Sequence, residues 1–291
     1  MSEKIERLFL VAGAMKAGTT WLFSALRGHP QLSTVVLKEI HYFSRGYVPW
    51  DALGDADRIH RVADYFGGHG PYSKPETYGV EEAVRDLEWF KKYVSGPVGI
   101  EWFKRLFGDV PEGDYLCDFS PFTCLVDGNG IDEIISSSEV RRVMFVIRKP
   151  LERYWSHYNF HKSMFNPNDD LNAYSVEEIR DELLSSDFYM HGCYSRFIKI
   201  AREKFHEKEF IVKRFEDIVI NPWSELANIE RFLGVRQHIY GGLELRNKVF
   251  ETRALNMPSN FIEACRPLID EEREALESIG FSTPACYWTE E

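Results

Sequence analysis

Short apolar runs rich in β-branched residues recur along this chain, with helix-patterned segments between most of them. A run of this length, bounded by polar or glycine-rich residues, is typical of a buried strand in a parallel sheet. We therefore predict an α/β fold, with a mainly parallel central sheet flanked by helices on both faces. The runs lie at residues 8–12, 33–37, 115–119, 143–147 and 210–214.

Two segments in the second half carry clear helical signals. In 221–234, Asn221 is a candidate cap, Pro222 suits the first helical position and Gly234 ends the pattern. In 191–206, apolar residues recur at helical spacing, so we expect that face to lie in the core. The residues concerned are Tyr194, Phe197, Ile198, Ala201 and Phe205.

The most informative segment joins the first predicted strand to a helix. Its sequence is Gly13-Ala14-Met15-Lys16-Ala17-Gly18-Thr19-Thr20, and the helical pattern over 20–27 ends at Gly28-His29-Pro30. Backbone N–H groups of such a loop and the helix dipole point to one place, which makes an anion site. In the nucleoside-triphosphate loop the lysine directly precedes the Ser or Thr, whereas Lys16 stands four positions before Thr20. This displacement favours an anionic nucleotide other than ATP bound with magnesium.

The pattern G-x-x-K-x-G-T-T-x-L resembles the 5′-phosphosulfate loop of sulfotransferases that use 3′-phosphoadenosine 5′-phosphosulfate (PAPS). The resemblance implies a P-loop-like nucleotide-binding fold in which Lys16 acts at the leaving phosphate. It also implies a nucleotide-binding set formed by Lys16, Ala17, Gly18, Thr19, Thr20 and Trp21.

A second motif follows the strand at 143–147. Arg148 is expected at the carboxyl edge of this strand, because Pro150 starts a helix directly afterwards. Ser156 lies about two turns into that helix, and an arginine with a hydroxyl suits a terminal phosphate. The pattern R-x-P-x-x-R-x-x-S-x-Y resembles the 3′-phosphate-binding segment of the same family. It implies that Arg148 and Ser156 hold the 3′-phosphate and that Arg153 supports the segment.

Between these motifs, Lys38-Glu39-Ile40-His41-Tyr42-Phe43 resembles the K-E-x-H-[FY]-F segment of the heparan-sulfate-type branch. This resemblance implies that Glu39 is the catalytic base, with Lys38 and His41 at the transferring sulfuryl group. His41 is the alternative base, since an imidazole titrates closer to neutrality than a carboxylate. A purely structural alternative makes Lys38 and Glu39 a solvent-exposed salt bridge at a strand end.

The sequence departs from the family pattern in two places. At 115–121 it has no lysine where the polysaccharide enzymes often show E-K-S-x-x-Y. The basic, glycine-rich loop expected near the C-terminus is also unclear, and its candidates are Arg246, Lys248 and Arg253.

Composition narrows the partners. With 46 acidic and 35 basic residues the net charge is −11, which argues against a nucleic-acid surface or a polysulfated polymer. A local basic cluster, Arg141, Arg142, Arg148, Lys149 and Arg153, suits one small anionic nucleotide. Five scattered cysteines indicate reduced thiols, and no apolar run reaches transmembrane length. With no signal-peptide pattern at the start of the sequence, we expect a cytoplasmic, bacterial-type enzyme.

These observations predict one domain over residues 1–291, with an acceptor-side insertion or lid at about 45–98, where periodicity is weak. The predicted enzyme moves a sulfuryl group in line from PAPS to an acceptor hydroxyl, releasing 3′,5′-bisphosphate (PAP) without a metal. The acceptor is a small molecule, a lipid-like compound or a saccharide, with an amine as the weaker alternative. The oligomeric state stays open.

Two other functions are consistent with parts of the sequence. A kinase-like phosphotransferase would use Asp118 to hold magnesium, although the position of Lys16 speaks against it. A non-catalytic nucleotide-binding protein would not need Lys16, Glu39 and His41 together.

Overall fold

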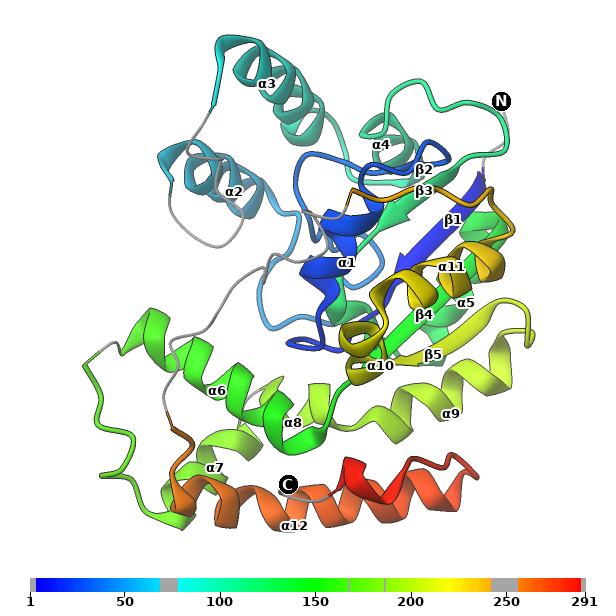
Figure 1. Cartoon of the computed structure of the whole chain (residues 1–291). Coiled ribbons are helices and arrows are strands. Elements are labelled where there is room, and N and C mark those ends of the chain that lie inside the picture. Colours follow the sequence, from blue (N-terminus) through cyan, green and yellow to red (C-terminus); the bar gives the residue numbers. More distant parts are fainter. Residues whose placement is uncertain (1–3, 69–77, 167, 186, 242–255, 289–291) are drawn as a thin grey trace.

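A parallel sheet forms the centre of the protein (Figure 1). The computed structural model describes residues 4–68, 78–166, 168–185, 187–241 and 256–288. Within these residues five strands pair in the order β2-β3-β1-β4-β5, and every pairing is parallel. The α/β fold class predicted from the sequence is confirmed. The strands are β1 (Ile5–Val11), β2 (Leu32–Ser33), β3 (Tyr115–Asp118), β4 (Ser138–Ile147) and β5 (Phe210–Arg214).

The position of β1 decides where a ligand can bind. It pairs with β3 on one side and β4 on the other, with Leu10 opposite both Asp118 and Val143. The chain first builds the side of β2 and β3 and then crosses to β4 and β5. Ligands of open parallel sheets bind beyond the carboxyl ends of the strands, where this order reverses.

Helices cover both faces of the sheet. In Figure 1, α1 (Thr19–Leu26) and α11 (Pro222–Leu233) lie on the near face, with α10 (Phe215–Ile220) beside them. On the far face α5 (Gly128–Ser137) packs against α9 (Tyr194–Lys204). The helix predicted at 221–234 is confirmed as α11: Asn221 and Pro222 start it, and Gly234 ends it at φ 67°.

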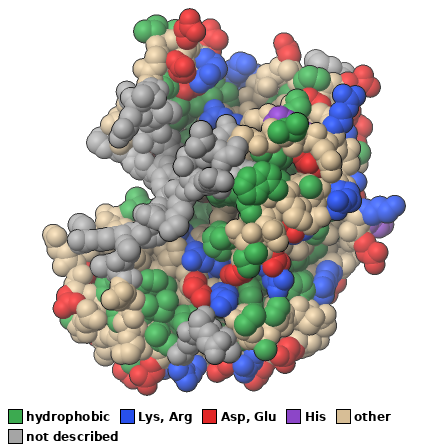
Figure 2. Space-filling view, in the orientation of Figure 1, with side chains coloured by type: hydrophobic (Ala, Val, Ile, Leu, Met, Phe, Trp, Pro, Cys, Tyr) green, Lys and Arg blue, Asp and Glu red, His purple; other side chains and the backbone are tan. Residues whose placement is uncertain are grey.

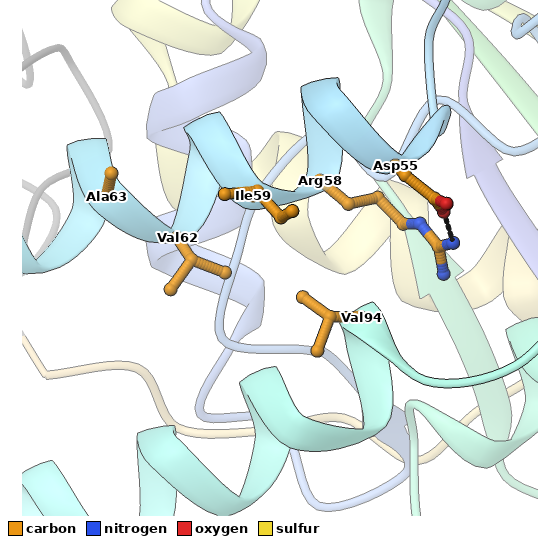
Figure 3. Close-up of a pocket in the computed structure, with 6 residues that line it drawn as sticks. All are labelled: Asp55, Arg58, Ile59, Val62, Ala63 and Val94. Atoms are coloured by element: carbon orange, nitrogen blue, oxygen red, sulfur yellow. Dashed lines mark hydrogen bonds and ion pairs between the residues drawn. The ribbon is translucent and has the colours of Figure 1, made fainter.

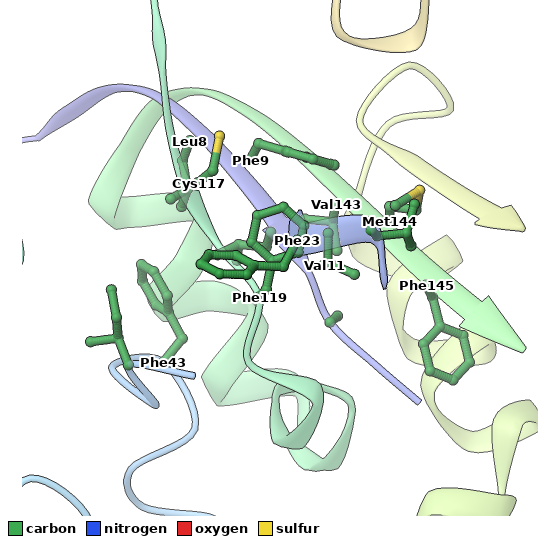
Figure 4. Close-up of a cluster of buried hydrophobic side chains, with 14 of the residues drawn as sticks. Leu8, Phe9, Val11, Phe23, Phe43, Cys117, Phe119, Val143, Met144 and Phe145 are labelled. Atoms are coloured by element: carbon green, nitrogen blue, oxygen red, sulfur yellow. The ribbon is translucent and has the colours of Figure 1, made fainter. Parts of the chain in front are cut away.

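The core follows the apolar runs of the strands (Figure 4). Phe119, just after β3, contacts the rings of Phe9 and Phe23 edge to face, with centroids 6.0 and 5.4 Å apart. All five residues that the sequence placed on the apolar face of 191–206 are buried.

Below the sheet in Figure 1, four helices form a second layer with a core of its own. Tyr154 and Tyr158 of α6 pack there with Phe188 and Phe261. Packing in this layer holds α6, which begins three residues after the end of β4, in place. The helices are α6 (Pro150–Phe165), α7 (Val176–Ser185), α8 (Asp187–Gly192) and α12 (Ser259–Ser278).

The described residues of 45–98 contain two regular helices, which the sequence did not predict. They are α2 (Asp55–Gly67) and α3 (Val80–Val94), followed by α4 (Ile100–Arg105). Their inner face is built from aromatic residues such as Tyr65, Trp89, Phe90 and Tyr93. Val80, Val84 and Leu87 of α3 are exposed. Figure 1 shows this pair beside the sheet rather than on either face.

An open groove of about 540 Å³ lies between α2 and α3 (Figure 3). It includes none of the site residues predicted from the sequence. Its lining is Asp55, Arg58, Ile59, Val62, Ala63 and Val94. Among the described residues, no helix combines the length and hydropathy needed to cross a membrane.

Candidate functional site

The loop between β1 and α1 is fastened to the end of β4. The N–H of Ala14 donates to the Val146 carbonyl at 2.7 Å, and the N–H of Val146 donates to the Gly13 carbonyl at 2.7 Å. Gly18 adopts φ 83° immediately before α1, a conformation that favours glycine. A Cβ at Gly18 would also come within 2.6 Å of the Phe215 ring. Gly18 is therefore required both by its backbone angle and by close packing.

This loop presents unpaired donors at the start of α1. The N–H groups of Gly18, Thr19 and Thr20 donate to no acceptor in the described part of the chain. No acidic side chain occupies the first turn of α1. Together with the helix dipole, these donors have the arrangement that suits the anion site predicted from the sequence. Trp21, the last residue of the predicted set, is partly buried and packs against the core.

Lys16 is a partly buried cation at this site. Its ammonium lies 4.1 Å from the centroid of the Phe160 ring on α6. Burial lowers the pKa of Lys16 to about 8, with help from Arg148 and Lys38 and against the opposing effect of Glu39. Positive charges therefore outweigh negative ones around Lys16, which suits a site for an anion.

Arg148 connects the two predicted nucleotide motifs. Its Nη1 donates to the carbonyl of Lys16 at 3.0 Å, and its guanidinium lies 4.9 Å from the Phe215 ring centroid. Burial lowers its pKa from the usual value. Ser156 lies further along α6 and is half-buried. The structure thus brings Arg148 to the same edge of the sheet as the loop at 13–20.

Arg153 lies inside the protein, on α6. Its side chain is fully buried, and its Nη2 donates to the Phe188 carbonyl on α8 at 2.7 Å. This contact ties α6 to α8, which is consistent with support of the segment rather than contact with a ligand.

The basic cluster predicted at 141–153 is wrong for two of its members. Arg141 and Arg142 lie in the first half of β4, whereas Arg148 follows its carboxyl end. Arg141 pairs with Glu209 at 3.4 Å, and Arg142 donates to the Phe232 carbonyl at 2.9 Å. Six strand residues span about 20 Å, so neither shares the anion site.

Lys38, Glu39 and His41 lie together and are all buried. Lys38 Nζ donates to Glu39 Oε1 at 2.5 Å, and His41 Nε2 lies 3.6 Å from Glu39 Oε2. The latter distance is a contact rather than a hydrogen bond. The alternative of a solvent-exposed salt bridge is therefore wrong, because the pair is enclosed by protein.

The environment of His41 makes it a weak base. Its ring packs edge to face against Trp50 and Phe122, with centroids 5.6 and 5.5 Å away. Burial lowers its pKa to about 3, with Arg61 as the next cause. His41 is therefore neutral near pH 7 and has little affinity for a proton, so Glu39 is the better candidate base.

Three of these residues share an unusual backbone conformation. Lys16, Glu39 and His41 have φ of 65°, 66° and 62°, and Leu53 is the remaining non-glycine residue with positive φ in the described part of the chain. Such angles are costly for residues with a Cβ and cluster at functional sites. The packing around them must therefore hold the conformation.

Part of that support comes from the residues at and just after the end of β3. Ser120 Oγ accepts from the His41 N–H at 2.9 Å and donates to Asp118 Oδ1 at 2.7 Å. Burial raises the pKa of Asp118 to about 6. Sequence analysis offered Asp118 only as a magnesium ligand and did not predict this contact, although its place at a strand end was a signal. No group of acidic, cysteine or histidine side chains suited to a metal occurs among the described residues.

Three predicted residues cannot be placed. Arg246, Lys248 and Arg253, the candidates for a loop that closes over the nucleotide, lie outside the described residues.

Comparison with known proteins supports the fold. The family model for the sulfotransferase domain matches residues 133–261, which include Arg148 and Ser156. Similar solved structures include a sulfotransferase from Alicyclobacillus acidocaldarius, at 17% identity and TM-score 0.61, with 97% of this chain and 98% of that chain covered. The sulfotransferase domain of the Synechococcus PCC 7002 olefin synthase is 17% identical, with a TM-score of 0.56. This similarity covers 97% of this chain and 98% of that chain.

The sulfotransferase domain of the curacin biosynthetic pathway is 12% identical, with a TM-score of 0.56, over 97% of this chain and 100% of that chain. No curated protein matches the chain significantly. At these identities the structural likeness establishes a shared sulfotransferase fold, and the residues of the site must carry the functional argument.

Proposed function

We propose that the protein is a sulfotransferase that uses PAPS as donor and acts on a hydroxyl of a small acceptor. The observations that carry the proposal are the unpaired N–H groups at the start of α1, the bond from Arg148 to the Lys16 carbonyl, and the buried Glu39 carboxylate, whose charge acts on Lys16. Lys16 can stabilise a departing phosphate, and Glu39 can take a proton. The family match over residues 133–261 supports the same reaction class.

The donor substrate would be held from two sides. The N–H groups of Gly18, Thr19 and Thr20 and the hydroxyls of Thr19 and Thr20 suit the 5′-phosphate, and Arg148 with Ser156 suits the 3′-phosphate. The N–H of Ala17, also predicted for this set, donates to the Ala14 carbonyl at 3.2 Å. Unpaired N–H groups at a helix start and a half-buried guanidinium match the charge of such a nucleotide.

The reaction needs one proton acceptor and one cation. The acceptor oxygen forms a bond to sulfur while the bond from sulfur to the bridging oxygen of the 5′-phosphate breaks. The electron pair remains on that oxygen of PAP, beside the Lys16 ammonium. The acceptor proton passes to Glu39, as the resemblance to the heparan-sulfate-type branch implies. The buried Lys38 ammonium, 2.5 Å from Glu39, offsets charge at the transfer site.

Aromatic side chains next to the base favour an acceptor with an apolar part. Trp50 is 38% exposed and contacts both His41 and Phe122. Figure 2 shows basic side chains interspersed with acidic ones on its face, rather than gathered in a continuous basic strip. We therefore favour a small-molecule or lipid-like hydroxyl over a saccharide, and an amine least.

Calorimetry tests the donor assignment. PAP and ATP are titrated into the protein with and without magnesium. We expect tighter binding of PAP that does not depend on magnesium, followed by sulfuryl transfer from PAPS to hydroxyl compounds with an aromatic or alkyl group. Preference for ATP with magnesium would instead support a phosphotransferase, and PAP binding without any transfer would support a non-catalytic nucleotide-binding protein.

A further inference from the structure

One side chain of the α2–α3 pair reaches the backbone of residues 38–41, which contain the candidate base Glu39. Arg61, in the middle of α2, donates from Nη2 to the Glu39 carbonyl at 2.6 Å and to the Lys38 carbonyl at 3.3 Å. Its Nη1 donates to the Tyr93 hydroxyl of α3 at 3.2 Å. The guanidinium thus links both helices of the pair to residues 38 and 39.

The contact falls where the backbone is strained. Glu39 has φ 66°, and a non-glycine residue in this region costs free energy that surrounding contacts must offset. Ser120 holds the N–H of His41 from the side of β3, and Arg61 holds the carbonyls of residues 38 and 39 from α2. The segment is therefore fastened at both ends by groups from different elements.

Arg61 also places a positive charge near His41, the neighbour of the candidate base Glu39. Besides burial, three charged groups act on the pKa of His41: Arg61 and Lys38 lower it, and Glu39 raises it. Asp118 is a fourth titratable group nearby, bonded to Ser120. A cation at Arg61 therefore supports the neutral state of His41.

Arg58 provides an internal comparison. It lies one turn earlier on α2, and its guanidinium donates to the carbonyls of Tyr93 and Gly96, both at 3.2 Å, and to Asp55 at 2.6 Å. These contacts join α2 to the end of α3 and do not involve residues 38–41. The two arginines of α2 therefore make different contacts: Arg58 joins α2 to α3, and Arg61 also bonds to the backbone of residues 38 and 39.

We propose that Arg61 is a positioning residue, through which the α2–α3 pair fixes the backbone of residues 38–41 and hence the aim of Glu39. The insertion is then part of the catalytic scaffold. The kinetic part of this inference rests on the proposed sulfotransferase activity, while the structural part does not.

The experiment compares Arg61→Gln, Arg61→Lys and the control Arg58→Gln, each checked for a cooperative melting transition. Amide hydrogen exchange is measured on the peptide covering residues 38–44. We expect faster exchange there in Arg61→Gln, a smaller change in Arg61→Lys and none in Arg58→Gln, whose faster exchange is confined to α2 and α3.

The kinetic readout uses the same variants. Misplacement of a base by about 1 Å costs up to about 100-fold in rate, so Arg61→Gln should lower kcat about 10- to 100-fold. Its affinity for PAP should stay within about 2-fold, with partial recovery of kcat in Arg61→Lys. Unchanged exchange at 38–44 in Arg61→Gln, or equal losses in Arg58→Gln at similar melting temperature, would overturn the proposal. If the wild type transfers no sulfuryl group, the exchange result still decides the positioning role.

Discussion

The donor side and the base side of the site are built differently. On the donor side, contiguous residues at 13–20 supply a glycine-shaped loop and backbone N–H groups, and Arg148 joins them from the neighbouring strand. On the base side, residues 38–41 have almost no regular structure of their own. Their conformation is held by Ser120, 79 positions from His41, and by Arg61.

This difference predicts two distinct kinds of functional loss, one in nucleotide binding and one in the rate of transfer. Damage to the donor side should reduce nucleotide binding or the stabilisation of the leaving group, because its groups would contact the anion directly under the proposed function. Damage to the base side should reduce the rate of transfer while leaving the nucleotide bound. The following predictions test whether the two sides separate in this way.

The largest effect is expected for Lys16→Ala. Loss of the cation at the leaving oxygen should lower kcat about 1,000-fold, as for loss of one preorganised group at a developing charge. The melting temperature should not fall, because the pKa of Lys16 is lowered to about 8 and its buried charge therefore disfavours folding near pH 7. Turnover and thermal unfolding are measured together. Near-normal turnover would refute the assignment of the loop.

Glu39→Gln should rank next. Removing the base should lower kcat about 100-fold or more, while the affinity for PAP changes by less than about 2-fold. Steady-state kinetics and calorimetry give the two numbers. His41→Gln is the matched comparison, and we expect it to retain more activity because the pKa of His41 is held near 3. The opposite ranking would make His41 the base.

Arg148→Ala should act mainly on binding. Loss of a charge-assisted contact to the 3′-phosphate should weaken PAP about 10- to 100-fold, with little change for AMP, which lacks that phosphate. Arg142→Ala is the matched control on the same strand, because its side chain faces Phe232 at the other end of β4. Equal losses for PAP and AMP would count against the 3′ role of Arg148.

The smallest effect concerns pH. Lys16 must carry its proton to attract PAP, and in the free protein that proton is lost above a pKa of about 8. Affinity for PAP should therefore be constant below pH 8 and fall by up to about tenfold per pH unit above it, with proton uptake on binding. Calorimetry in two buffers of different ionisation enthalpy measures that uptake. Lys16→Arg should remove this dependence, since arginine stays protonated.

Sequence and structure agree best where the signal is local. Four of the five apolar runs became strands of the described sheet, because burial in a parallel sheet requires continuous apolar segments. The run at 33–37 was wrong as a strand, since β2 (Leu32–Ser33) overlaps it only at Ser33 and its other residues have no regular structure. The loop at 13–20 was also predictable, since its glycines and lysine define a conformation within a few residues. The α2–α3 pair was missed because the glycines and prolines of residues 45–98 suggest loops, although both helices are amphipathic.

The sequence by itself determined the fold class, and it supplied as candidates the glycine-rich loop at 13–20 and the residues Lys16, Glu39, His41 and Arg148. Only the tertiary structure separated Arg141 and Arg142 from the site, and only it brought Ser120 and Arg61 to the segment at 38–41. The physical reason is that periodicity and spacing describe contacts within a few residues of one another. The partners of a strained, irregular segment come from distant parts of the chain, and packing alone selects them.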